Sequence, residues 1–291
     1  MKRDDRPYGV GRLKWVSTHW LADHLEDGST ILDVQADVHD YFMAHIPGAV
    51  YLTDKTLRAP LRGLPAQILM PEIIGSIFGR VGITNTEPVV VYTGKGGFKG
   101  MGDGLEQCMM AYTLLRMNHG EVYLLDGGLD KWMAEGKETS QRFPEVTPAT
   151  FQTKINNEMF VELEEFRKIK DAEDTILLDA RPERVYTGET GPWIRNGHIP
   201  GAVNLPWANL MDPDNKTFLK PVDEIKGQAE NVGATRDKLV ICSCGTGREA
   251  TNEYTIFKHL LGYPRVRLYE GSFTEWSAHP ELEVIKGPNP R

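Results

Sequence analysis

The stretch HIPGAV occupies residues 45–50 and returns unchanged as residues 198–203. Three further features recur around it in the same order: an apolar run ending in aspartate, a second apolar run, and a closing acid–glycine pair ahead of a tryptophan. The matched stretches are 31–33 with 176–179, 89–92 with 239–242, and 124–127 before Trp132 with 268–271 before Trp276. The offsets run from 144 residues (276 − 132) to 153 residues (198 − 45). Four ordered matches indicate an internal duplication.

Length and composition agree with two globular domains. The chain has 291 residues, and a domain typically takes about 100–200. The formal net charge of −8 argues against a nucleic-acid partner, which would need a basic surface. Apolar runs are too short to span a membrane, and the charged start lacks the apolar stretch of a secretory signal. We therefore expect no membrane partner and a cytoplasmic location, unless a signal segment has been removed.

The apolar runs predict an α/β fold. They are short, β-branched and almost continuous, which is typical of buried strands in a parallel sheet. Helical spacing of apolar residues follows in both halves, at 105–115 and at 250–261. Each half should therefore be a mainly parallel sheet flanked by helices. Residues 141–150 hold two prolines and no helical pattern, so we place a linker there, between domains at 1–142 and 151–291.

The cysteines separate into packing residues and one candidate nucleophile. Three cysteines are too few for a disulfide framework, and the absence of a CxxC pair predicts no structural metal site. Cys108 lies on an apolar helix face and Cys242 within an apolar strand, so both are predicted to be core residues. Cys244 instead stands where a strand enters a glycine-bearing loop.

The loop after Cys244 favours an anionic sulfur. Gly245 and Gly247 permit tight backbone conformations, so successive amides can point at one atom. The helix that follows adds the positive end of its dipole, and both effects favour thiolate. Arg248 supplies a fixed positive charge for an anionic substrate. Glu249 is expected to cap the helix and to point away from the sulfur.

In these residues the sequence resembles the rhodanese family, as two tandem rhodanese-like domains over nearly the whole chain. The resemblance rests on the aspartate that ends the first strand, the repeated HIPGA, the CGTG loop at Cys244 and the closing stretch at 270–276. It implies a sulfurtransferase without metal or organic cofactor. Cys244 would take sulfur from a small anionic donor, foremost thiosulfate, hold it as a persulfide, and pass it to cyanide or a thiol.

The resemblance also implies that the halves differ. Thr93 takes the place of Cys244 in the first domain, so that domain is expected to be catalytically inactive. Gly245 and Thr246 look like the loop of 3-mercaptopyruvate-type members, although Arg248 and Glu249 depart from it. The family's substrate-binding arginine falls on Val185 here, with Arg184 one position early.

The predicted site therefore has Cys244 as catalytic residue and a set of substrate-binding candidates. These are Gly245, Thr246, Gly247 and Arg248 in the loop, and Arg181, Arg184 and Arg195 around the second HIPGAV. His45 and His198 recur in both halves, including the half without a nucleophile, which favours a structural role.

Three alternatives stay open beside thiosulfate as donor. The first is 3-mercaptopyruvate as the donor, and the second is a protein-interaction module that carries a persulfide. The third is a tyrosine-phosphatase-like enzyme, which needs an arginine six positions after the cysteine, where this chain has Ala250.

Overall fold

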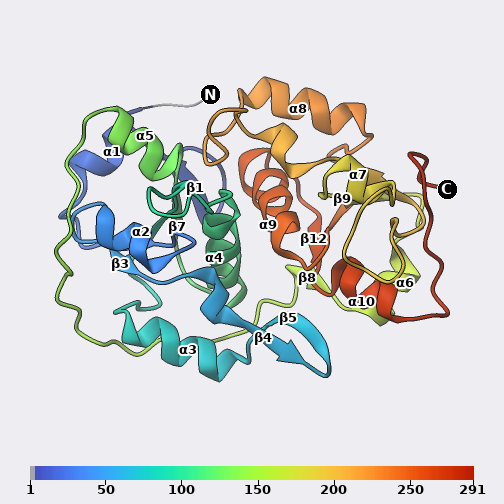
Figure 1. The fold of residues 1–291 in the computed structure, drawn as a ribbon, viewed down its shortest axis with the longest axis horizontal. Helices are drawn as coiled ribbons and strands as arrows, with labels where there is room; N and C mark the ends of the chain where they lie inside the picture. The colour runs from blue at the N-terminus through green and yellow to red at the C-terminus, as the bar shows by residue number, and fades with distance from the viewer. Residues whose placement is uncertain (1–3) are drawn as a thin grey trace. The chain divides into compact units, whose positions relative to one another are not determined.

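The computed structural model describes residues 4–291 and divides them into two compact units (Figure 1). The first comprises 4–59, 68–156 and 212–219, and the second comprises 60–67, 157–211 and 220–291. These units differ from the predicted contiguous ranges of 1–142 and 151–291 by two short exchanged segments, 60–67 and 212–219, and by residues 151–156, which belong to the first unit. The segment 212–219 is fixed within the first unit, where the Asp126 carboxylate accepts the Leu219 N–H at 2.9 Å and the Thr217 carbonyl accepts the Gly127 N–H at 3.1 Å.

The first unit is built on a parallel sheet in the order β1-β7-β6-β2-β3. Its strands are β1 (Leu13–Val16), β2 (Thr30–Asp33), β3 (Val50–Tyr51), β6 (Val89–Tyr92) and β7 (Val122–Leu125). Its helices are α1 (Thr18–Asp23), α2 (Val38–Met43), α3 (Pro71–Arg80), α4 (Leu105–Arg116) and α5 (Gly128–Ala134). A separate pair of strands, β4 (Arg58–Leu61) and β5 (Leu64–Ile68), lies between β3 and α3 along the chain.

The second unit repeats this order strand for strand, as β8-β12-β11-β9-β10, again with parallel neighbours. Its strands are β8 (Phe160–Val161), β9 (Thr175–Asp179), β10 (Ala202–Asn204), β11 (Leu239–Ser243) and β12 (Val266–Tyr269). Its helices are α6 (Leu163–Ile169), α7 (Glu183–Tyr186), α8 (Val222–Asn231), α9 (Arg248–Thr255) and α10 (Ser272–Ala278). The predicted duplication and the α/β fold are therefore both present.

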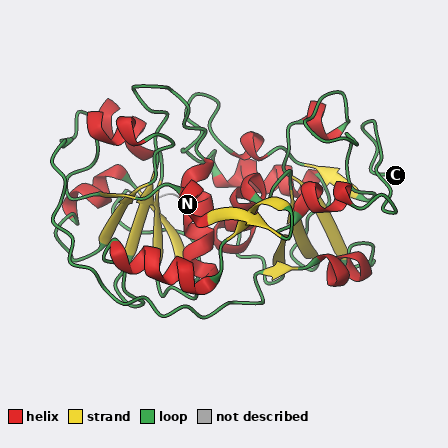
Figure 2. Ribbon diagram, turned by 60° about the horizontal axis from the view of Figure 1, so that its bottom comes forward, coloured by secondary structure: helices red, strands yellow, loops and turns green. Residues whose placement is uncertain are grey.

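The central strands explain why the sheets form. All four residues of β6 are buried, as are the last four of β11, so each strand is covered on both faces. Figure 2 shows helices on either side of the strands in each unit. Burial on both faces is what a nearly continuous apolar run requires, because side chains alternate between the two faces.

The register fixes the equivalence of the two halves at the carboxyl ends of these strands. Asp33 at the end of β2 pairs with Tyr92 at the end of β6. Asp179 at the end of β9 pairs with Ser243 at the end of β11. The next residue in each central strand is Thr93 or Cys244, so these two occupy the same place in the fold.

Candidate functional site

Cys244 is held between β11 and the start of α10. It follows the last residue of β11 and is completely buried. Its N–H donates to the Ser272 hydroxyl at 3.2 Å, and its carbonyl accepts the Phe273 N–H at 2.9 Å. The carboxyl ends of parallel strands are the usual place for ligands in α/β sheets. The backbone of Cys244 is therefore fixed at the edge where chemistry is expected.

The two glycines of the loop are needed for different reasons. Gly247 has a φ of +82°, which favours glycine, and it forms the N-cap of α9. A Cβ there would also lie 2.9 Å from the Glu270 carbonyl oxygen. Gly245 does not have a positive φ; a Cβ on it would lie 3.0 Å from the Trp193 ring. The prediction of a special backbone conformation holds for Gly247, whereas the absence of a side chain at Gly245 leaves room for the Trp193 ring.

Two backbone amides face the sulfur, as the loop pattern predicted. The N–H groups of Thr246 and Ala250 hydrogen-bond to the Cys244 sulfur and lower its pKa. Burial acts more strongly in the opposite direction, and with the charge of Glu249 it raises the pKa of Cys244 to about 12. The amides therefore act in the predicted direction, but desolvation of the fully buried thiol outweighs the amide cradle.

Glu249 points toward the sulfur, contrary to the sequence-based expectation. This half-buried side chain, in the first turn of α9, accepts hydrogen bonds from the Cys244 thiol and from the Gly245 N–H. Burial, followed by the nearby charge of Asp179, raises the pKa of Glu249 to about 7. The loop between Cys244 and α9 is only three residues long, so the first turn of the helix folds back over the sulfur.

Arg181 is not a substrate-binding residue, because other groups of the protein hold its guanidinium. Its guanidinium forms a buried ion pair with Asp179 at 2.5 Å and donates to the Gly197 carbonyl at 2.8 Å. The guanidinium carbon also lies 4.3 Å from the Phe273 ring centroid and 5.3 Å from that of Trp193. Its charge is balanced by Asp179, so the residue positions the end of β9.

Arg195 is likewise a structural residue. Its guanidinium donates to the backbone carbonyls that follow the body of α10, with distances of 2.6 Å to both the Leu282 and the His279 oxygens. Because backbone carbonyls already occupy this guanidinium, Arg195 cannot also bind a donor anion. The prediction that Arg195 binds substrate is therefore corrected.

Arg184 is a solvated surface charge: its side chain is 74% exposed, and its Nε atom lies 3.6 Å from the Glu189 Oε2 atom. Arg248 is the first residue of α9 and is half-buried, four positions after Cys244.

The repeated histidines hold equivalent turns. His45 is buried, stacks on Tyr41 at 4.0 Å and contacts the Tyr41 and Arg142 carbonyls through its two ring nitrogens. His198 does the same with Tyr186, at 3.9 Å, and with the carbonyls of Tyr186 and Asn289. The expected structural role of both histidines is confirmed.

The other two cysteines are core residues, as predicted. Cys108 is 2% exposed on α4 and Cys242 is fully buried on β11. Burial raises the pKa of Cys242 well above its ordinary value, which makes it a poor nucleophile.

Three residues that support the loop escaped sequence reasoning. The Ser272 hydroxyl accepts the Cys244 N–H, and the Thr274 N–H and hydroxyl both donate to the Gly245 carbonyl, at 3.0 and 2.8 Å. Trp193 donates its indole N–H to Thr274 at 3.0 Å while its ring covers Gly245. The closing stretch at 270–276 was a visible signal for the first two, but nothing local marks Trp193.

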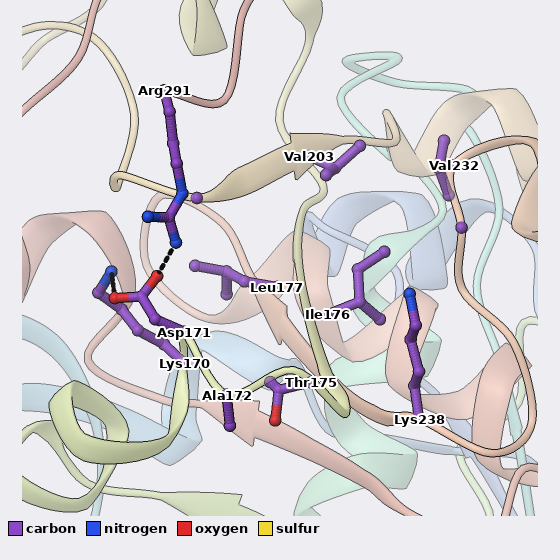
Figure 3. A pocket seen from close by; sticks show the side chains of 12 residues that line it. Lys170, Asp171, Ala172, Thr175, Ile176, Leu177, Val203, Val232, Lys238 and Arg291 are labelled. Carbon is purple, nitrogen blue, oxygen red and sulfur yellow. Dashed lines mark hydrogen bonds and ion pairs between the residues drawn. The ribbon is translucent and has the colours of Figure 1, made fainter.

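A cavity of about 320 Å³ lies at the other end of the same sheet (Figure 3). Its lining includes Thr175 at the start of β9 and Lys238 just before β11. Figure 3 shows Asp171 bound by Lys170 and by Arg291, at 2.7 and 2.5 Å. Cys244 does not line this cavity, so the candidate chemistry lies at the opposite edge.

No helix in the described part of the chain combines the length and the apolar character needed to cross a membrane.

Comparison with known proteins places the chain among several curated relatives. A putative thiosulfate sulfurtransferase of Synechococcus elongatus is 37% identical, over 95% of this chain and 86% of that protein. The sulfur carrier protein TtuD of Thermus thermophilus is 31% identical, over 94% and 96%. The 3-mercaptopyruvate sulfurtransferase of Escherichia coli is 29% identical, over 93% and 97%.

The fold is also found in solved structures. The anaerobic ergothioneine biosynthesis enzyme of Chlorobium limicola superposes with a TM-score of 0.82 at 24% identity, over 95% of this chain and 70% of that one. The family model described as Rhodanese-like domain matches residues 17–135 and again residues 162–279. The chain belongs to the rhodanese family and carries two of its domains.

Proposed function

We propose that this protein is a sulfurtransferase that moves sulfane sulfur from thiosulfate to a thiophilic acceptor through a persulfide on Cys244. The second domain would carry the chemistry, and the first, with Thr93 in the equivalent place, would be inactive. The observation that carries the proposal is the cysteine at the end of β11 whose sulfur is faced by the amides of Thr246 and Ala250. Fixed amide dipoles suit a persulfide anion, because they stabilise charge without reorganising.

We assign to Arg248 the binding of the anionic sulfur donor. Arg181 is neutralised by Asp179, Arg195 is bound to carbonyls and Arg184 faces solvent. Arg248 stands four residues after the nucleophile, at the end of the loop formed by Gly245, Thr246 and Gly247. A guanidinium there would hold a sulfonate or a carboxylate through charge-assisted hydrogen bonds.

3-Mercaptopyruvate is the second candidate donor, and the acids around Cys244 favour it. Asp179 and Glu249 both raise the pKa of Cys244, so their charges are felt at the sulfur. Thiosulfate brings two negative charges into this field, whereas 3-mercaptopyruvate brings one. The relative named 3-mercaptopyruvate sulfurtransferase covers nearly the whole chain.

Steady-state turnover with thiosulfate and with 3-mercaptopyruvate, each paired with cyanide and with a dithiol, tests the proposal. We expect ping-pong kinetics with a preference for thiosulfate. A preference for 3-mercaptopyruvate would keep the persulfide and change the donor. Single loading without turnover would instead support a carrier function, and one relative is named a sulfur carrier protein. The cytoplasmic location stays a prediction.

A further inference from the structure

The Cys244 thiol and the Glu249 carboxylate form a pair inside the loop. The thiol donates to the carboxylate, which also accepts the Gly245 N–H. Independent evidence of the orientation is that a Cβ on Gly245 would lie 3.8 Å from the Glu249 Oε2 atom. The acid is therefore directed at the nucleophile and is held there by the loop backbone.

The first domain holds the same acid without the thiol. Glu106 is the second residue of α4, as Glu249 is of α9, and it is buried. Its Oε2 atom accepts the Gly104 N–H at 3.0 Å and lies 3.5 Å from the Thr93 hydroxyl. An acid at the second position of this helix can thus hold the preceding loop in either domain. Only in the second domain does the acid face a thiol, which must lose its proton before it attacks.

The chemistry of sulfur uptake requires such a proton acceptor. Thiolate, not thiol, attacks a sulfane sulfur, yet burial keeps the Cys244 proton in place at neutral pH. His198, the second domain's copy of the repeated histidine, has both ring nitrogens bound to backbone carbonyls. A carboxylate already hydrogen-bonded to the thiol has the geometry of a general base.

We propose that Glu249 accepts the Cys244 proton during sulfur uptake and returns it when the sulfur leaves; this rests on the proposed function. The S–H bond breaks, its proton goes to the carboxylate, and its electron pair forms a bond to the outer sulfur of thiosulfate. The S–S bond of thiosulfate breaks and its pair leaves with sulfite. The products are the Cys244 persulfide anion, sulfite and the neutral acid of Glu249, with a total charge of −3 before and after.

The return step balances in the same way. Cyanide takes the outer sulfur as thiocyanate, the pair of the persulfide bond stays on the Cys244 sulfur, and Glu249 gives back its proton. During the persulfide state the acid is neutral, so it no longer repels the anions beside it. Protonation of Glu249 therefore removes the repulsion between this acid and the persulfide at the moment when the anion forms.

The groups around Glu249 set its titration. Burial raises the pKa of Glu249 most and Asp179 at the end of β9 raises it further, while the Gly245 amide, Arg181 and the Cys244 thiol lower it. Glu253 lies one turn further along α9, is fully buried, and has its own pKa raised by Glu249. With a pKa of about 7, Glu249 is close to the value at which a general base works best at neutral pH.

Single-turnover sulfur uptake from thiosulfate, followed from pH 5 to 9, tests the inference. The wild-type rate constant at saturating donor should rise through about pH 7, since Glu249 accepts a proton only when ionised. Glu249→Gln should lower this rate constant by about a hundredfold or more and lose the rise near pH 7, following thiol ionisation at higher pH instead. Glu249→Asp should keep the rise at a reduced rate.

Two matched controls separate a proton acceptor from a structural acid. Glu106→Gln removes the equivalent acid of the first domain, and Glu253→Gln replaces a buried acid by its neutral isostere. Glu106→Gln should leave the uptake rate and its pH profile unchanged. Glu253→Gln should keep the limiting uptake rate and the rise of that rate with pH, because Glu249 is still present to accept the proton. If Glu249→Gln does not fold, as judged by its thermal melt and circular dichroism, the loss of rate and the retained pH profile in Glu249→Asp still decide the question.

The outcomes distinguish this inference from the proposed function. If wild type takes up no sulfur on Cys244, the proposed function fails first. If wild type is loaded but Glu249→Gln reaches the same or a faster limiting rate, Glu249 only raises the thiol pKa and the inference is wrong. A change confined to the half-saturating thiosulfate concentration would likewise contradict it, because that result reports charge repulsion of the donor.

Discussion

The two domains share one scaffold and differ at the residues that touch the nucleophile position. Thr93 and Cys244 follow equivalent strands, and their carbonyls accept the N–H of Leu129 or Phe273, each at 2.9 Å. Around them the second domain has Ser272, whose hydroxyl accepts the Cys244 N–H, where the first has Gly128. The fold therefore needs the backbone contacts, whereas the side chains at these places are open to specialisation.

The helices that follow the two loops differ in their first residue. α4 begins with Leu105 where α9 begins with Arg248, although both follow a glycine cap in the left-handed conformation. The loop before α4 runs from Thr93 to Gly104 and is much longer than the three-residue loop before α9. The comparison shows that a three-residue loop, a thiol and an arginine at the first helical position occur together in the second domain, and that the first domain has none of the three at the equivalent places.

The partners of the strand-end aspartates give the largest expected contrast in stability. Asp179 forms a buried ion pair with Arg181, whereas Asp33 accepts hydrogen bonds from the neutral groups of Tyr92 and Gln35. Asp179→Asn leaves a buried guanidinium without its counter-charge and should lower the free energy of unfolding by about 3–5 kcal/mol. Asp33→Asn should cost about 1–2 kcal/mol. Urea unfolding of both variants measures the difference, and equal losses would show that the ion pair is not the distinguishing feature.

Arg248 gives the next largest effect, on activity alone. A charge-assisted contact to an anionic donor is typically worth about 1.5–3 kcal/mol, so Arg248→Ala should lower donor turnover efficiency by roughly ten- to a hundredfold. Arg248→Lys should recover only part, because a point charge replaces a planar fork. Single-turnover kinetics should place the loss in sulfur uptake rather than in cyanide attack. Unchanged uptake from both donors would mean that Arg248 does not bind the anion.

A smaller contrast concerns the pH dependence of stability in the first domain. Burial raises the pKa of Asp33 to about 6, above its value in the unfolded chain. The folded state therefore binds its proton more tightly, so this contribution to stability is present below about pH 4 and is lost as the pH rises through 6. Asp33→Asn should flatten the decline in melting temperature between pH 4 and 7. A decline of the same steepness in the variant would assign it to other groups.

Much of this architecture could be predicted because its signals are local. Buried strands are apolar runs, the duplication is visible as a repeated hexapeptide, and Cys108 and Cys242 lie on apolar patterns. The arginines could not be sorted in the same way. Arg195 binds the carbonyls of residues more than 80 positions away, and the pairing of Arg181 with Asp179 rather than with a ligand depends on burial that no local pattern encodes.

The site chemistry was predictable only in part, for a related reason. The strand–loop–helix pattern located the cysteine and its facing amides, which are backbone features. The pKa of Cys244 instead depends on a balance of burial, amides and a nearby acid, and the largest of these is set by the whole fold. The direction of Glu249 depends on the curvature of a three-residue loop, which composition alone does not determine.

The most direct test of the central claim, that sulfur chemistry belongs to Cys244 and not to the first domain, is intact mass after exposure to donor. Wild type and Thr93→Ala should each gain the mass of one sulfur atom, carried by the peptide that contains Cys244, and should lose it on treatment with cyanide. Cys244→Ser should gain nothing. A sulfur adduct that persists at one site in Cys244→Ser, or that disappears in a folded Thr93→Ala protein, would contradict the account.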